Sequence, residues 1–158
     1  MTTCNNNFHF ENRFHVLFGS ENYKTLNKNV IDITVPSINI GATPQPTNIK
    51  TIYRPGDSLD FGDINMTFLL DEDYSNYLTL VEWLNRLRNF REVSLEEDIV
   101  DIAISLLDAK YKNVFTVNCE DCFIYNISDV FLNQQIDSTE PVRFLASFKV
   151  NNIVYTRG

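Results

Sequence analysis

Three groups of side chains in this sequence have types and spacings that could do chemistry. The first is Cys119 and Cys122, separated by Glu120 and Asp121, a CxxC pair of the kind that binds zinc or cycles between thiols and a disulfide. Structural zinc needs four ligands, and no second CxxC or His pair lies nearby. A thioredoxin-type site opens a helix, whereas this pair lies between two expected strands. The pattern therefore favours a small, partly buried turn.

Carboxylates form the second group. Asp57, Asp60 and Asp63 could suggest a cation site, but their spacing is not that of an EF-hand and no Glu closes a twelve-residue loop. The run Asp71-Glu72-Asp73 could supply acid–base chemistry, although capping of a following helix explains it without further assumption. A turn acid, a loop acid and a solvated strand face account for the first three.

The third group is the two histidines, His9 and His15, neither of which stands near a candidate nucleophile. His15 falls on the strand face opposite Val16, which favours an exposed or interface histidine over a catalytic one. The five glycines are scattered and form no phosphate-binding loop. The sequence therefore predicts a protein that is not an enzyme and that uses no metal or other cofactor.

Composition bounds the fold class and the partners. The 158 residues, 44% of them hydrophobic, suit one soluble domain with its own core, and 12 Phe with 7 Tyr favour sheets over a helical bundle. The net charge of -8 argues against stable binding of nucleic acid, but not against DNA that slides past an acidic wall. Three cysteines fit a reducing compartment. Without a secretory signal or a long apolar run, we expect a cytoplasmic protein with no membrane partner.

The elements that must position these groups follow from hydrophobic periodicity. One helix is expected to begin at Asp71-Glu72-Asp73 and to end near Arg91, with Glu82 paired to Arg86 four residues on. Its apolar stripe consists of Tyr77, Leu80, Val81, Leu84 and Leu87, broadened by Tyr74, Leu78 and Trp83. Alternation predicts strands at residues 14–19, 30–35, 49–53, 63–70, 99–107, 114–117, 123–128, 142–150 and 153–155.

Four segments are predicted to lack regular structure. Residues 1–13 are a polar arm, residues 20–29 a turn or loose hairpin, residues 37–48 an irregular loop or arm, and residues 92–98 an exposed acidic loop. In residues 30–35 the expected faces are Val30, Asp32 and Thr34 against Ile31, Ile33 and Val35. The result is a single α+β domain over residues 14–158, mostly antiparallel sheet with one flanking α-helix.

The stretch from Arg54 to Leu84 resembles a known family. It contains a turn at Arg54-Pro55-Gly56, an alternating strand that ends at Asp71-Glu72, and Trp83 about a dozen residues later. These motifs resemble the tail-tube-fold proteins of contractile-tailed bacteriophages, and among them the tail-completion (tail-tube terminator) proteins of T4-like phages. The likeness continues more weakly over the whole domain. The Asn-rich start and the short acidic loop depart from the family pattern and leave the member of the family open.

The resemblance implies a two-sheet β-sandwich or half-barrel, six copies of which form a ring around a channel. A terminator ring is assembled in the host cytoplasm and caps the head-proximal end of the tail tube in the virion. There it contacts tube, sheath and neck proteins while phage DNA passes without stable binding. Within this class the alternatives are the major tail tube subunit and a baseplate tube initiator. A small metal- or redox-dependent enzyme, built on the CxxC pair or the acidic clusters, is the alternative from another class.

Two sets of residues are candidates for assembly. The predicted lumen surface consists of Asp32, Thr34, Asp63, Asn65 and Thr67, for which simple solvent exposure is a nearly equal alternative. The predicted oligomer or neck interface consists of Ser37, Ile38, Asn39, Ile40, Gly41, Ala42, Thr43, Pro44, Gln45 and Pro46, with Phe8 and Phe10 of the N-terminal arm.

Overall fold

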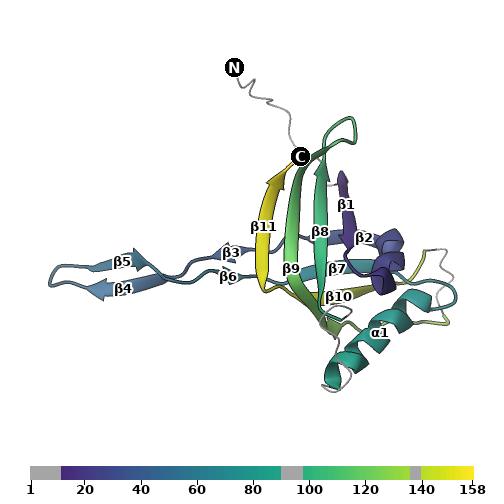
Figure 1. Ribbon diagram of the computed structural model, residues 1–158. Helices are drawn as coiled ribbons and strands as arrows, with labels where there is room; N and C mark the ends of the chain where they lie inside the picture. Colours follow the sequence, from purple (N-terminus) through teal and green to yellow (C-terminus); the bar gives the residue numbers. More distant parts are fainter. Residues whose placement is uncertain (1–11, 90–97, 136–139) are drawn as a thin grey trace.

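The computed structural model describes residues 12–89, 98–135 and 140–158, and one long strand, β9 (Asn113–Ile127), joins its two sheets (Figure 1). The first half of β9 lies between β8 and β11, and its second half pairs with β10, always antiparallel. In chain order the other elements are β1 (Phe14–Phe18), η1 (Glu21–Asn29), β2 (Val30–Thr34), β3 (Ile38–Asn39), β4 (Ala42–Pro46), β5 (Thr51–Pro55), β6 (Asp60–Phe61), β7 (Ile64–Leu69), α1 (Ser75–Arg88), β8 (Val100–Leu107), β10 (Arg143–Lys149) and β11 (Asn152–Arg157).

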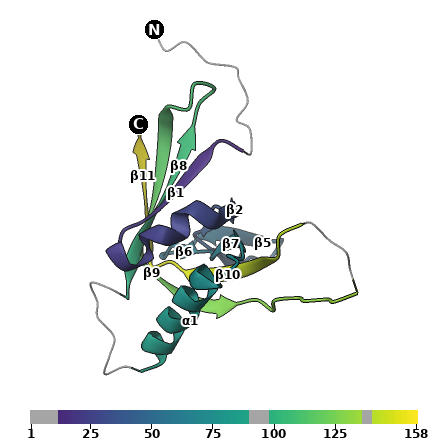
Figure 2. The ribbon, with the colours of Figure 1, turned by 90° about the vertical axis from the view of Figure 1, so that its right-hand side faces the viewer.

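The two sheets extend from β9 and bend where they meet. The first sheet has the order β1-β8-β9-β11, and the second has the order β9-β10-β7-β2. The pairings of β9 with β8 and with β10 both shift register, as β-bulges do where a strand turns sharply. Figure 2 shows the first sheet standing upright and the second lying across its lower end. The predicted fold class, a mostly antiparallel two-sheet structure with an α-helix beside it, is confirmed.

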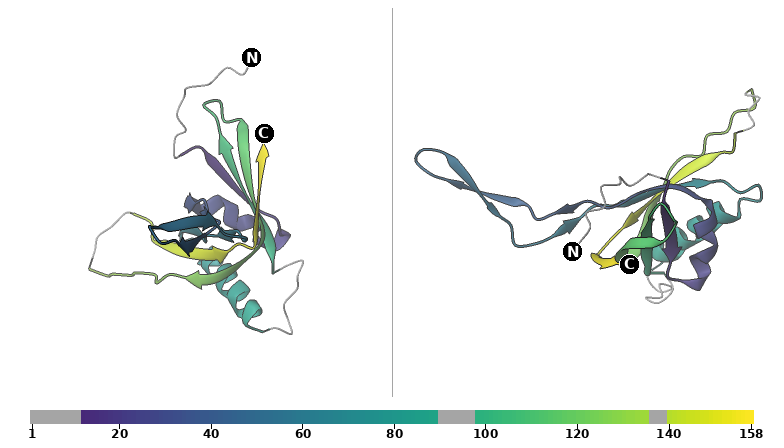
Figure 3. Two further views of the ribbon diagram at one scale, coloured as in Figure 1. Left: turned by 90° about the vertical axis from the view of Figure 1, so that its left-hand side faces the viewer. Right: turned by 90° about the horizontal axis from the view of Figure 1, so that it is seen from above.

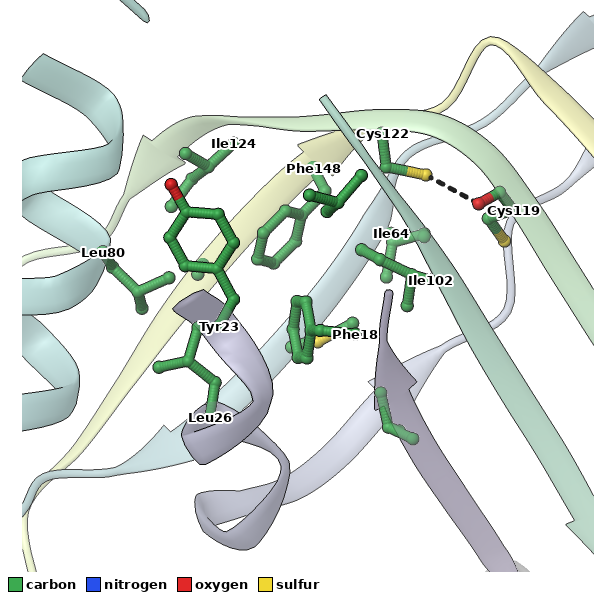
Figure 4. Close-up of a cluster of buried hydrophobic side chains, with 14 of the residues drawn as sticks. Phe18, Tyr23, Leu26, Ile64, Leu80, Ile102, Cys119, Cys122, Ile124 and Phe148 are labelled. Atoms are coloured by element: carbon green, nitrogen blue, oxygen red, sulfur yellow. Dashed lines mark hydrogen bonds between the residues drawn. The ribbon is translucent and has the colours of Figure 1, made fainter. Parts of the chain in front are cut away.

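The hydrophobic core fills the angle between the sheets, and α1 and η1 close it. Tyr23 of η1 stacks on Trp83 of α1 with ring centroids 4.1 Å apart, and Trp83 lies 5.6 Å from Phe148 of β10. Burying side chains of this size contributes roughly 1.5–3 kcal/mol each. Other fully buried side chains around them include Phe18, Leu26, Ile64, Met66, Phe68, Leu80, Ile102, Ile104 and Ile124, several of which appear in Figure 4.

The prediction of a turn or loose hairpin at residues 20–29 is wrong, because Glu21–Asn29 form the 3-10 helix η1. Ser20 begins it, and its side-chain oxygen accepts a hydrogen bond from the backbone N–H of Asn22 (3.4 Å). Tyr23 and Leu26 are three residues apart, which places them on one face of a helix with three residues per turn, and both are buried. This short apolar period carries the signal that the sequence analysis missed.

The α-helix begins at Ser75, after the acidic run rather than within it. Tyr74, at a left-handed φ of 60°, precedes the helix and has no side-chain cap. The acids still stabilise this end: Asp73 accepts a hydrogen bond from the Ser75 N–H (3.2 Å), and Asp71 accepts one from the Ser75 hydroxyl (2.8 Å). The helix ends at Arg88, and Arg91 lies outside the described residues.

Trp83 is fully buried at one edge of the apolar stripe of α1, whose centre is Leu80. At about 100° per residue, Leu78 and Tyr74 lie about 140° and 180° from Trp83, and their exposed fractions are 51% and 40%. The expected broadening of the stripe to these two positions is therefore wrong. The side chains of α1 that pack into or against the core are Tyr77, Leu80, Trp83, Leu84 and Leu87.

Asp98 was expected in an exposed loop, but it is fully buried. Its carbonyl oxygen accepts a hydrogen bond from the indole N–H of Trp83 (2.7 Å), and its carboxylate accepts one from the Tyr23 hydroxyl (3.3 Å). Arg86 Nε lies 3.3 Å from the same carboxylate. Partners of this kind are what a buried carboxylate requires. The rest of the predicted acidic loop, residues 92–97, lies outside the described residues. No helix in the described part of the chain is long and apolar enough to cross a membrane.

Candidate assembly surfaces

The five residues of the predicted lumen surface come together on the second sheet. In the pairing of β2 with β7, Asp32 lies opposite Thr67 and Thr34 lies opposite Asn65. Directly opposite residues of an antiparallel pair point to the same face of the sheet. Asp63 immediately precedes β7 and accepts hydrogen bonds from side chains of β9 and β10. The other face of β7 is buried in the core, so these five residues belong to the outward face.

A β-bulge in β2 produces this alignment. Val30 and Asp32 lie opposite consecutive residues of β7, which leaves Ile31 as the extra residue. Val30 and Ile33 therefore both pack against the core. The prediction that Val30 shares a face with Asp32 is wrong for this reason, because one extra residue reverses the alternation.

A hydrogen-bonded cluster extends the polar face from β7 onto β10 and β9. The carboxylate of Asp63 accepts hydrogen bonds from the Tyr125 hydroxyl (2.6 Å) and from the Lys149 ammonium (2.9 Å). The ammonium lies 4.7 Å from the centroid of the Tyr125 ring. Beside this cluster, the hydroxyl of Ser147, a buried side chain, donates a hydrogen bond to Asn65 Oδ1 (2.8 Å).

The three ionisable groups of the cluster shift one another's pKa. Hydrogen bonds from Tyr125 and then from Lys149 hold the pKa of Asp63 below its usual value. The hydrogen bond to Asp63 raises the pKa of Lys149, and the hydrogen bond to Asp63 also raises the pKa of Tyr125. The three groups therefore favour a carboxylate, an ammonium and a neutral phenol at neutral pH.

The sequence analysis did not include Tyr125, Ser147 or Lys149 in this surface. The alternation of β10 would have found two of them, because Ser147 and Lys149 alternate with the core residues Phe144, Ala146 and Phe148. Tyr125 carries no such signal. A register shift in the pairing of β9 with β10 changes the face to which Tyr125 belongs.

The second surface is a long two-stranded arm between β2 and β7. The short strands β3 and β6 pair at its base, and β4 and β5 pair beyond them. Figure 3 shows the arm projecting away from the two sheets. The prediction of an arm at residues 37–48 is correct in position, but the segment is regular rather than irregular. Pro44 and Pro46 do not prevent this, because each strand of a two-stranded ribbon has one unpaired edge.

Two glycines hold the base of the outer ribbon together. Gly41 adopts a φ of +72°, which favours glycine, and its carbonyl accepts a hydrogen bond from the Gly56 N–H (3.2 Å). A Cβ atom at Gly56 would lie 2.4 Å from the carbonyl oxygen of Ile40. Arg54 and Pro55 belong to β5. The predicted Arg54-Pro55-Gly56 turn is therefore wrong, because Arg54 and Pro55 lie in a strand and Gly56 follows it.

The outer ribbon has one apolar face, which the described residues of the chain leave open. Pro44 lies opposite Tyr53, and Ala42 lies opposite Pro55, so these four side chains share a face. Every residue of β4 and β5 is exposed, and Tyr53 is 67% exposed. Ile49 at the tip is 95% exposed. The opposite face is mostly polar, with Thr43, Gln45 and Arg54. The assignment of Ser37–Pro46 to an interface stays a prediction, and Phe8 and Phe10 lie outside the described residues.

The CxxC pair lies within the continuous strand β9, and both thiols are fully buried. The prediction of a partly buried turn between two strands is therefore wrong. His15 is exposed on β1, as predicted. Across residues 12–89, 98–135 and 140–158, no three His, Cys, Asp or Glu side chains are grouped so that they could hold a metal ion.

No protein-family model matches the sequence, and no curated protein matches it. Solved structures do match. A chain of the sheath–tube complex of an extracellular contractile injection system, PVC in its extended state, superposes with a TM-score of 0.71 at 14% identity, over 97% of this chain and 94% of that chain. A chain of the six-fold symmetrised baseplate of the anti-feeding prophage gives 0.71 at 12% identity, over 96% and 97% of the two chains.

A chain of the anti-feeding prophage cap, the tube terminating cap, also gives a TM-score of 0.71, at 14% identity over 100% of both chains. The matches cover almost the whole of each chain, including the arm and both sheets. Identities of 12–14% show a shared fold and not a shared role. The protein has the tail-tube fold found in contractile injection assemblies.

Proposed function

We propose that this protein is a structural subunit of a contractile tail-like tube, and that six copies form a ring at the head-proximal end of that tube. The observation that carries the proposal is the arm, whose apolar face is open among the described residues. Contiguous exposed apolar residues of this kind mark contact with another protein. A contact between the arm of one copy and a different surface of the next is heterologous, and such contacts form a ring when the rotation between copies closes.

The polar face of the second sheet suits the wall of a channel. Asp32 is exposed on it, and the charge of Lys149 is neutralised by Asp63 at 2.9 Å. A DNA-binding surface needs unneutralised Lys and Arg to displace counterions from phosphates. A wall built from carboxylates, amides and hydroxyls instead lets a polyanion pass without stable binding. We therefore assign Asp32, Thr34, Asp63, Asn65 and Thr67 to the lumen, as the sequence analysis predicted.

The ring at the head-proximal end would contact tube subunits on one side and neck and sheath proteins on the other. The second candidate role is that of a major tube subunit or baseplate tube initiator. The similarity to chains of a sheath–tube complex and of a baseplate favours this alternative, since the fold recurs in both. Both roles use the same ring and differ only in whether a further ring is added.

Mass photometry and negative-stain microscopy of the purified chain test the ring. We expect six-fold rings, and a monomer at every concentration would contradict the proposal. Added to tube subunits of the same assembly, a terminator should limit tube length, whereas copolymerisation into long tubes would support the major-subunit role.

Two double variants test the part played by the arm. Replacing Pro44 and Tyr53 by Ser makes the centre of the apolar face polar, with Ala42 and Pro55 left in place, and should abolish rings without changing Tm. The matched control, Thr43→Ser with Gln45→Ser, alters the opposite face of the same ribbon and should leave rings intact. Loss of rings in both variants, or in neither, would argue against an apolar arm contact.

A further inference from the structure

The two buried thiols lie at the bend between the sheets, where the register of β9 changes. Cys119 lies opposite Ile102 and Cys122 lies opposite Val100, so three steps along β9 face two steps along β8. Asp121, at a φ of 54°, takes up the extra residue. The bulge places both cysteines on the buried face, although their spacing would put them on opposite faces of a regular strand. Figure 4 shows both side chains at the edge of the core.

The two cysteine side chains lie beside each other. The Cys122 thiol donates a hydrogen bond to the carbonyl oxygen of Cys119 (3.3 Å). The neighbouring Cys122 thiol lowers the pKa of the Cys119 thiol, because a hydrogen bond from it stabilises the thiolate, whereas the contact with Cys119 and burial raise the pKa of Cys122. These opposite directions favour Cys119 over Cys122 as the nucleophile.

We propose that Cys119 and Cys122 form a peroxide-reactive pair that closes to an intrachain disulfide within the folded protein. The Cys119 thiolate attacks one peroxide oxygen, the O–O bond breaks, and Cys119 becomes a sulfenic acid while hydroxide leaves and takes up a proton as water. The Cys122 sulfur then attacks the sulfenic sulfur, the S–O bond breaks, and the thiol proton leaves with the oxygen as a second water. Two thiols and one hydrogen peroxide give one disulfide and two waters.

Burial selects the oxidant. Both side chains are fully buried, so a small neutral peroxide reaches them during brief local openings more readily than a bulky disulfide does. The product crosslinks the bulge that turns β9 from one sheet into the other. Oxidation therefore fixes the bend of β9, whichever role the subunit has in a tube.

The experiment uses the full chain with Cys4→Ser, which leaves only the two buried thiols. The chain is treated with hydrogen peroxide in native buffer, then unfolded, alkylated with iodoacetamide and mapped by mass spectrometry. We expect a Cys119–Cys122 disulfide, lighter than the reduced peptide by two hydrogen atoms and reversed by dithiothreitol. Two fully alkylated cysteines after treatment, or a disulfide that forms only in denaturant, would overturn the proposal.

Two single variants in the same background assign the roles. Cys122→Ser keeps a hydroxyl donor beside Cys119, so dimedone should trap a sulfenic acid there. Cys119→Ser should trap at least about tenfold less on Cys122, the change in thiolate for one pKa unit. Equal trapping of sulfenic acid in the two variants would contradict the assignment of Cys119 as the nucleophile. Oxidised glutathione should bridge the thiols more slowly than peroxide, and an equal rate would contradict selection by burial. The disulfide is measured on the chain that has both thiols, so this test remains valid even if a Ser variant fails to fold.

Discussion

The arm, with β4 paired to β5, and the β9 ribbon, with β9 paired to β8, are both antiparallel pairs of strands. They differ in what stabilises them. In the β9 ribbon, alternate side chains such as Val117 and Cys119 are buried in the core. In β4 and β5 every residue is exposed. The backbone hydrogen bonds of the two pairs are alike, and a typical one contributes only about 0.5–1.5 kcal/mol net. An isolated two-stranded hairpin is marginal in water for this reason.

The two regions therefore differ in where their apolar side chains find contacts. The core ribbon is complete within one chain, because its apolar face already has partners. The arm has an apolar face that no residue in the described part of the chain covers, and its regular pairing presents that face in a fixed orientation. Substitutions in the core should therefore change the stability of the monomer, and substitutions in the arm should change assembly.

The largest effect is expected at Trp83. Replacing it by Ala removes the stack on Tyr23, the contact with Phe148 and the hydrogen bond to the Asp98 carbonyl. Large-to-small core substitutions of this kind cost about 3–5 kcal/mol, which chemical denaturation would measure. The control is Leu78→Ala, on the exposed side of the same helix, which should change the free energy of unfolding by less than about 0.5 kcal/mol. Similar losses in both variants would contradict the orientation of α1.

A smaller effect on stability, with a large effect on assembly, is expected at Gly56. In Gly56→Ala the new Cβ atom meets the Ile40 carbonyl oxygen, a backbone atom, so the base of the outer ribbon must shift. Because the arm lies outside the core, the free energy of unfolding should change by less than about 0.5 kcal/mol. Hydrogen exchange should rise in β4 and β5, and ring formation should fall.

The control for this variant is Thr43→Ala, in the same ribbon but away from the close approach. It should change neither the exchange of β4 and β5 nor the rings. A loss of several kcal/mol in Gly56→Ala would mean that the arm folds as part of the core. The arm and the β9 ribbon would then both contribute to the stability of the monomer.

Sequence periodicity predicted most of the fold because most strands follow regular alternation. β1, β7, β8 and β10 fall within about a residue of their predicted bounds, and Ile64, Met66 and Phe68 occupy the buried face as expected. The five lumen candidates were also assigned to a common face, which the pairing of β2 with β7 supports. Alternation is informative wherever one face of a strand is buried.

Prediction failed where the period changes or where prolines and acids suggest loops. A bulge at Ile31 reversed the faces of β2, and the bulge at Cys119 and Cys122 divided one strand into two predicted ones. The single three-residue interval between Tyr23 and Leu26, in an otherwise polar segment, is too short a pattern to indicate a helix. The arm was expected to be irregular because the rules for strands exclude internal prolines, although an edge tolerates them.

The smallest effect on stability is expected from replacing Asp63. The pH dependence of that effect shows whether Asp63 contributes through its charge. Its lowered pKa means that its contribution to stability is present above the ordinary value of 3.8 and is lost as the pH falls through the lowered pKa. The raised pKa of Lys149 means that its contribution is present below 10.5 and is lost as the pH rises through the raised pKa. Tyr125, also raised, loses its contribution above 10.0 in the same way.

Replacing Asp63 by Asn should therefore lower Tm by less than about 3 °C near neutral pH, because an exposed ion pair contributes little. The difference from the natural chain should shrink as the pH falls below 3.8 and vanish once the pH is below the lowered pKa of Asp63. It should shrink again as the pH rises through the raised pKa of Lys149, as thermal unfolding across pH would measure. Asp32→Asn is the control, since Asp32 is exposed on the same sheet face. If the difference persisted at acid pH, the cluster would act through packing rather than charge. The polar face would then stabilise the monomer, as the β9 ribbon does. It would not be a surface that, like the arm, contacts another subunit.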